Sequence, residues 1–213
     1  MSTVAAPPRK KRRKRSPEEA REEALIAARD LLLTRGPKAV TLSNVGQAIG
    51  MTHANVIHHF GSASELQSAL MGSMVADLTA AIEGAVEHVR SDSAAPRALV
   101  DIVFDAFDKG GAGLLAAWMA LSQDIEHLEP VRNAVQSLVR AIEERAGVEG
   151  DEAHRRITSA VLLISLCAFA DSLIGPPLRG ILGRDDESAR RMTARLLPTF
   201  FAGAIPASND PEA

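Results

Sequence analysis

The strongest constraint on the fold is a series of helix-start signals between residues 16 and 66. Ser16-Pro17-Glu18-Glu19 combines an N-cap serine, a proline at the first helical position and an acid at the third. Thr41 and Thr52 can each cap a short helix, with Gly50 as the turn between them, and Ser62 opens a further capping box. These signals predict four helices, over residues 16–35, 41–49, 52–60 and 62–89.

The rest of the chain is also patterned as helices. Aromatic residues make up only 3% and tyrosine is absent, while Ala, Leu, Glu and Arg dominate, which favours helices over strands. We expect Pro176-Pro177 to end one of the later helices, and Pro198 to kink or shorten the last one. Apolar residues recur at helical spacing in five segments, residues 97–108, 114–123, 131–146, 152–174 and 187–201. The prediction is an all-α fold of about nine helices with no sheet.

The charge is unevenly distributed. The formal net charge of −3 includes a block of seven cations without an acid; outside this block 17 basic residues face 27 acidic ones, a net of −10. Such a block repels itself, so we expect a disordered arm over residues 1–15. It can serve as an arm for nucleic acid, as a nuclear import signal or simply as a solvated tail. The seven residues are Arg9, Lys10, Lys11, Arg12, Arg13, Lys14 and Arg15.

Two short helices joined at Gly50, after a longer first helix, have the spacing of a helix-turn-helix. Residues 41–66 read TLSNVGQAIGMTHANVIHHFGSASEL. This string resembles the signature of the tetracycline-repressor (TetR) family, at Thr41, Val45-Gly46, Gly50, Thr52, His58-His59-Phe60 and Leu66. The resemblance implies a DNA-binding head over residues 16–62 and a ligand-binding and dimerisation domain over residues 63–205. The residues themselves predict a disordered tail over residues 206–213.

The third helix is the expected base-reading element. A recognition helix reads bases with its N-terminal residues, here Thr52, His53, Ala54 and Asn55. Asn55 can pair bidentately with adenine, and the Ala54 methyl can meet a thymine methyl. The helix starts near Thr41 and Ser62 suit phosphates. Asn44, His58 and His59 complete the DNA-binding candidates.

Two positions depart from the family pattern. Ile57 stands where the family usually has a tyrosine, and Ala63 where it usually has a lysine. Residues 41–64 also contain no Lys or Arg, although duplex binding normally depends on such charges. The positive charge therefore has to come from elsewhere, and the arm is the nearest supply.

The resemblance also implies a small-molecule pocket and a twofold dimer. The pocket candidates, each of which can equally be ordinary core, are Met71, Met74, Phe104, Phe107, Trp118, Met119 and Gln123. The last two helices are too apolar to face solvent as a pair, so we expect them to form a four-helix bundle with a second copy. The dimer candidates are Leu163, Leu166, Phe169, Leu196 and Phe200.

Catalytic and metal-binding functions find little support. Cys167 is the only cysteine, which excludes an internal disulfide and a cysteine-based zinc site, and the histidines lack metal-ligand spacing. The Gly110–Gly113 stretch lacks the Lys-Ser/Thr of a phosphate loop. Asp171 is unusual in an apolar helix and can pair with an arginine, cap a neighbouring helix or touch a ligand. No metal, cofactor or enzymatic activity is expected.

The sequence therefore predicts a cytoplasmic, ligand-responsive regulator that binds double-stranded DNA as a homodimer. We expect a repressor that a small apolar or amphipathic molecule releases from a palindromic operator. One alternative is a helical small-molecule-binding protein or enzyme that has lost specific DNA binding. Another is a protein that binds nucleic acid non-specifically through the arm alone. No membrane partner is expected, because Asp171 interrupts the longest apolar run before ~20 residues.

Overall fold

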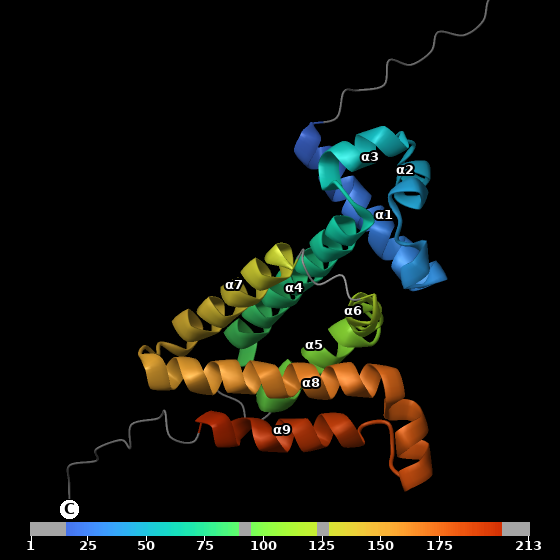
Figure 1. The fold of residues 1–213 in the computed structure, drawn as a ribbon. Helices are drawn as coiled ribbons and strands as arrows, with labels where there is room; N and C mark the ends of the chain where they lie inside the picture. The colour runs from blue at the N-terminus through green and yellow to red at the C-terminus, as the bar shows by residue number, and fades with distance from the viewer. Residues whose placement is uncertain (1–15, 90–94, 123–127, 202–213) are drawn as a thin grey trace, which may run out of the picture.

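The computed structural model describes residues 16–89, 95–122 and 128–201, which are all-helical (Figure 1). A short 3₁₀ turn, η1 (Pro37–Ala39), is the only other regular element in these ranges. The basic arm predicted over residues 1–15, the tail over residues 206–213 and Gln123 lie outside the described residues. The helices are α1 (Pro17–Arg35), α2 (Leu42–Ile49), α3 (His53–Phe60), α4 (Ala63–Val89), α5 (Ala95–Phe107), α6 (Ala112–Leu121), α7 (Glu129–Ala146), α8 (Asp151–Leu182) and α9 (Ser188–Phe201).

The predicted helix starts in the first part of the chain are confirmed. Ser16 Oγ accepts from the Glu19 N–H at 3.1 Å, and the Glu19 carboxylate accepts from the Ser16 N–H at 2.9 Å, which completes the capping box. Thr41 caps α2, Thr52 caps α3, and Ser62 Oγ accepts from the Glu65 N–H at the start of α4. Four local sequence signals thus define the boundaries of four helices.

Helix α4 runs from the head into the body and belongs to two hydrophobic cores. Its first half, with Leu66, Leu70 and Met74, packs with α1, α2, α3 and α6 in one core. Its second half, with Ile82, packs with α5, α7, α8 and α9 in the other core. Figure 1 shows the head of α1–α3 at one end of the molecule and the α8–α9 pair at the other, with α4 between them. The first core therefore extends beyond residue 62, into the predicted second domain.

The prediction that Pro176-Pro177 ends a helix at about Ile174 is wrong. Helix α8 continues through both prolines to Leu182. Figure 1 shows its C-terminal end turned sharply from the rest of the helix, as expected where prolines remove main-chain donors. The Arg179 guanidinium forms an ion pair with Asp171 across this region, and a β-carbon on Gly175 would overlap the Asp171 carboxylate. Asp171 therefore pairs with an arginine, one of the three roles expected for it.

Smaller differences concern the ends of the later helices. Helices α5 and α6 begin two residues earlier than predicted, and the four residues 108–111 separate them. Helix α7 begins at Glu129 and includes Pro130 in its first turn, where a proline loses no helical hydrogen bond. Helix α9 continues past Pro198 to Phe201, so Pro198 does not end it early.

Helix α8 is apolar on more than its core-facing side. By length and composition it is the one helix among the described residues that could cross a membrane, and 22% of its most apolar 18-residue stretch is buried inside the subunit. Leu162 and Leu166 are 60% and 57% exposed on α8, and Met192 and Leu196 are exposed on α9. A large apolar surface thus remains open on the α8–α9 layer, at the end of the molecule opposite the head (Figure 1).

Candidate nucleic-acid interface and cavity

Helices α2 and α3 pack closely because two glycines allow it. Gly50 ends α2 in the left-handed conformation, with φ +65° and its N–H directed to the carbonyls of Gly46 and Gln47. A β-carbon on Gly46 would lie 2.9 Å from Met51 O and 3.2 Å from Val56 Cγ2. Gly46 therefore sets the close approach of α3 to α2, which fixes the direction of α3 relative to the head.

Helix α3 is buried on one face and exposed on the other. Val56 and Phe60 point into the core, whereas the predicted base-reading residues Thr52, His53, Ala54 and Asn55 are all exposed. The Thr52 hydroxyl accepts from the Asn55 N–H at 3.3 Å, which leaves the Asn55 side chain outside the cap. His58 is exposed and His59 half-buried. The N-terminal turn of α3 thus presents a short polar surface, which is the arrangement a recognition helix needs.

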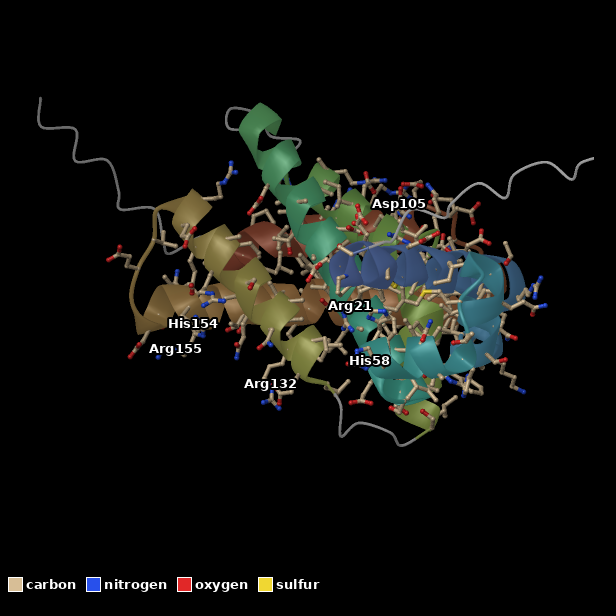
Figure 2. The ribbon with its side chains drawn as sticks, turned by 90° about the horizontal axis from the view of Figure 1, so that it is seen from above. Arg21, His58, Asp105, Arg132, His154 and Arg155 are labelled. Atoms are coloured by element: carbon tan, nitrogen blue, oxygen red, sulfur yellow. The ribbon has the colours of Figure 1, made fainter. Side chains whose placement is uncertain are left out.

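Arg21, which the sequence analysis did not select, anchors the C-terminal end of α3. Its Nη1 donates to the His59 carbonyl at 2.5 Å, and its guanidinium lies 4.4 Å from the centroid of the Phe60 ring. Figure 2 shows Arg21 and His58 on the head side of the molecule. A cation at a helix C-terminus also complements the helix dipole. The contact joins positions 38 residues apart, so no local spacing signals it.

Asn44 and Lys38 lie at the start of α2. The Asn44 N–H donates to Thr41 Oγ1 at 3.2 Å, and its side-chain amide donates to Ala39 O at 2.9 Å. Asn44 therefore stabilises the turn before α2, and contact with DNA stays a prediction for it. Lys38 is exposed beside this turn, with Nζ 5.9 Å from the Trp118 ring centroid. Lys38 was not predicted as a site residue, because it precedes the helix-turn-helix segment of residues 41–64.

The body contains a cavity of about 270 Å³ between the second half of α4 and helices α5, α7, α8 and α9. Its deep walls are buried apolar residues, among them Val103, Ile157 and Leu197. Its polar lining residues are Thr79, Glu83, Arg145 and Ser165, and none of the four is buried. The Thr79 hydroxyl donates to the Val75 carbonyl at 2.9 Å, so it is satisfied within α4.

The predicted pocket residues lie elsewhere. Met71, Met74 and Met119 belong to the first core, and Trp118 is half-buried on α6 beside Lys38. Phe104 belongs to the second core and Phe107 packs against it. None of these six lines the cavity, so effector binding stays a prediction for them. The lining of this cavity was not predicted from the sequence, because it combines aliphatic residues of five helices that each follow an ordinary core pattern.

Charged side chains join α5 to α9 beside the second core. Arg190 Nη2 donates to Asp105 at 2.6 Å and Arg190 Nη1 to Asp101 at 3.3 Å, while Arg97 forms an ion pair with Glu187 (Figure 2 labels Asp105). Burial acts to raise the pKa of Asp105, but the hydrogen bonds and charges of Arg190 and Lys109 outweigh it and lower that pKa. In contrast, burial raises the pKa of Asp171, although Arg179 opposes the shift.

Helix α6 connects the head to α8. Its Leu115 and Met119 pack in the first core, and a β-carbon on Gly113 would overlap the Ser172 hydroxyl of α8. Of the dimer candidates on α8 and α9, Leu166 and Leu196 are exposed, and Leu163, Phe169 and Phe200 are half-buried. Phe200 packs partly against the second core, so it does not point only outward.

In the part of the chain that the structure describes, no group of three or more His, Cys, Asp or Glu could hold a metal ion.

Comparisons with known proteins agree with the helix order and the head. Residues 24–70 match the family of bacterial regulatory proteins called the tetR family. The HTH-type transcriptional regulator BetI of Rhizobium meliloti (strain 1021) is 27% identical over 165 residues, which are 74% of this chain and 81% of that protein.

Solved structures show the same fold at low sequence identity. FadR of Thermus thermophilus, described as a TetR-family transcriptional repressor in complex with lauroyl-CoA, superposes with a TM-score of 0.57 at 16% identity, over 91% of this chain and 100% of that one. A transcriptional regulator of Rhodococcus sp. RHA1 superposes with a TM-score of 0.63 at 17% identity, over 87% of this chain and 99% of that one. The helix-turn-helix head, the helical body and these relatives together support a regulator of the TetR family.

Proposed function

We propose that this protein is a repressor that binds a palindromic operator as a homodimer and releases it when a small apolar or amphipathic effector fills the cavity. The observation that carries the proposal is the exposed N-terminal turn of α3, residues 52–55, on a helix held to the head at both ends. Val56 is buried against Gly46 of α2 in the first half of α3, and Arg21 binds the carbonyl at the other end. A base-reading helix needs this rigidity, because bidentate contacts to bases require a fixed geometry.

Phosphate contacts come from three sources in this proposal. The N-termini of α2 and α4 carry the positive ends of helix dipoles, and Lys38 stands beside the first of them. The arm of residues 9–15, outside the described part, adds seven cations per subunit. These charges compensate for the absence of Lys and Arg from residues 41–64.

The homodimer is supported by the open surface of the α8–α9 layer. Leu162, Leu166 and Leu173 recur at helical spacing on the outer side of α8 and stay exposed in the single subunit. Contiguous apolar surface of this kind marks a protein–protein contact. A twofold pairing of this layer would place two α3 helices for half-sites about one helical turn, ~34 Å, apart.

Helix α4 offers a physical route from the cavity to the head. Four residues of α4 line the cavity, namely Leu78, Thr79, Ile82 and Glu83. Residues of the first half of the same helix, among them Leu66 and Leu70, pack in the core of the head. An effector that spreads α4 from α7 would therefore change the position of α3. The structure of the repressor FadR, a relative of this fold, was solved with a bound small molecule, lauroyl-CoA. We place this repressor in the cytoplasm, because it acts on the DNA of the cell.

The test is a fluorescence-anisotropy titration of the full-length protein with DNA from upstream of its own coding region, against scrambled DNA of equal length. The proposal predicts saturable binding that survives excess scrambled competitor. Binding that any DNA removes would instead indicate an arm-only nucleic-acid binder. Absence of binding to the upstream and scrambled DNA would indicate a small-molecule carrier.

A further inference from the structure

The cavity has an unusually uniform lining. Its apolar lining residues, among those the structure describes, are all leucine, isoleucine, valine or alanine, without an aromatic ring, a methionine or a histidine. Sites for flat aromatic compounds use ring stacking, and sites for quaternary ammonium groups use aromatic cages. Neither recognition mode is available on these walls. What remains is dispersion and apolar burial, which favour a flexible saturated chain.

The polar residues that line the cavity are all at least partly exposed to solvent. Val103, Ile157, Ala160 and Leu197 form buried walls that offer no hydrogen-bond partner. A polar group placed against them would lose its water without compensation. Glu83 at the end of the α4 lining is half-buried, and Arg145 near the end of α7 is exposed. These two residues carry opposite charges, so the mouth does not select one sign of head group.

The volume sets the length of the chain. A dry cavity of about 150 Å³ holds one benzene molecule, six carbon atoms, so the 270 Å³ here accommodates about ten carbon atoms. Because a chain can extend through the open mouth, longer chains add methylenes that stay in water. Affinity should therefore rise with chain length and then level off.

We infer that the effector class is a medium-length aliphatic amphiphile, whose saturated chain of about eight to twelve carbons fills the cavity while its polar head stays at the mouth between Glu83 and Arg145. This inference rests on the proposed function for its regulatory meaning, but binding itself is independent of DNA. The chain is recognised by the aliphatic walls, and the head group contributes little selectivity.

The first test is isothermal titration calorimetry of the full-length protein with straight-chain carboxylates from hexanoate to hexadecanoate. The dissociation constant should fall about fourfold per methylene, equivalent to about 0.8 kcal/mol, up to about ten carbons and then level off. Decanol and decyltrimethylammonium should bind within about tenfold of decanoate, since the buried chain is the same. 2-Naphthoate, a rigid aromatic carboxylate, should bind at least tenfold more weakly than decanoate. Tighter binding of 2-naphthoate, or no dependence on chain length, would overturn the inference.

A pair of variants on α7 sharpens the test. Ala141 lines the cavity and is half-buried, so Ala141→Leu adds three carbons to the wall without replacing a fully buried residue. The chain length at which affinity levels off should fall by about three carbons. Ala134→Leu is the matched control, because Ala134 is half-buried on the same helix and does not line the cavity. An unchanged length dependence in Ala141→Leu would place the ligand elsewhere.

A separate measurement distinguishes the two proposals. Decanoate is added to the complex of the protein with its upstream DNA, and the release of DNA is followed by anisotropy. Tight, length-dependent binding of decanoate without release supports the inference about the cavity and contradicts the repressor mechanism. Release without length dependence contradicts the inference and leaves the repressor mechanism in place.

Discussion

The guanidinium of Arg21 on α1 binds the carbonyl of His59 at the last turn of α3 and lies over the ring of Phe60. Through this one side chain, the first helix of the protein holds the end of the helix that presents Thr52–Asn55. Arg21 therefore fixes α3 at the end opposite its exposed N-terminal turn. If that turn reads bases, as we propose, Arg21 would act on DNA through the position of α3.

Replacing Arg21 with Ala should weaken operator binding about tenfold while lowering stability by only about 1 kcal/mol, because Arg21 is exposed. The salt dependence of binding should stay unchanged, since no phosphate contact is lost. Arg35→Ala, at the exposed end of the same helix, is the control. If Arg21→Ala instead lowers the log–log salt slope by about 0.9 per subunit, Arg21 contacts phosphate directly.

Asn55→Ala should lose about 1–3 kcal/mol of binding free energy on the operator and little on random DNA, because a bidentate contact to a base edge disappears. Anisotropy titrations on both DNAs measure this difference. Equal losses on the two sequences would assign Asn55 to backbone positioning.

Deleting residues 1–15 should weaken binding to all sequences and flatten its salt dependence. If the two arms of a dimer neutralise five phosphates, the slope falls by about 4 to 5 units, at ~0.9 per phosphate. The preference for operator over random DNA should largely survive, because α3 is unchanged. A truncated protein with the full-length slope would show that the arm does not touch DNA.

Leu166→Glu should convert the protein from a dimer to a monomer. Leu166 is 57% exposed in the subunit, so the substitution is tolerated there, whereas a glutamate buried between two copies costs about 3 kcal/mol or more. Size-exclusion chromatography with light scattering measures the mass. Leu121→Glu, on the exposed side of α6, should remain a dimer and serves as the control. A dimeric Leu166→Glu protein would place the interface on another surface.

Asp105→Asn should destabilise the protein at neutral pH and cease to do so in acid. Because the folded-state pKa of Asp105 lies below its unfolded value of about 3.9, the stabilisation is present above that value and is lost as the pH falls through the folded pKa. We expect about 1 kcal/mol at pH 7, a modest effect because the carboxylate is 42% exposed. Urea unfolding at fixed protein concentration measures the free energy of unfolding against pH, with the exposed Asp30→Asn as control. The curves of the wild type and Asp105→Asn should converge as the pH falls below about 3.9. A difference that is independent of pH would exclude the ion pair as its cause.

The sequence predicted the head better than the body because the two depend on different ranges of interaction. Capping by Ser16, Thr41 and Thr52 involves partners three residues away, and such signals are visible in the sequence alone. Helix α8 instead continues through Pro176-Pro177 with both prolines exposed, and the ion pair that spans them joins Arg179 to Asp171, eight residues apart, which no local spacing signal indicates. Arg21 and the cavity lining depend on contacts between distant segments, so no local pattern indicated them.

The place of α4 in both hydrophobic cores has a consequence for measurements made with both ligands present. If filling the cavity weakens operator binding by a given factor, thermodynamic reciprocity requires that operator DNA weakens effector binding by the same factor. A protein bound to operator DNA would then bind the effector more weakly than a free protein does. The concentration of effector that induces a gene would therefore depend on how many operators share the available protein, and not on the cavity alone.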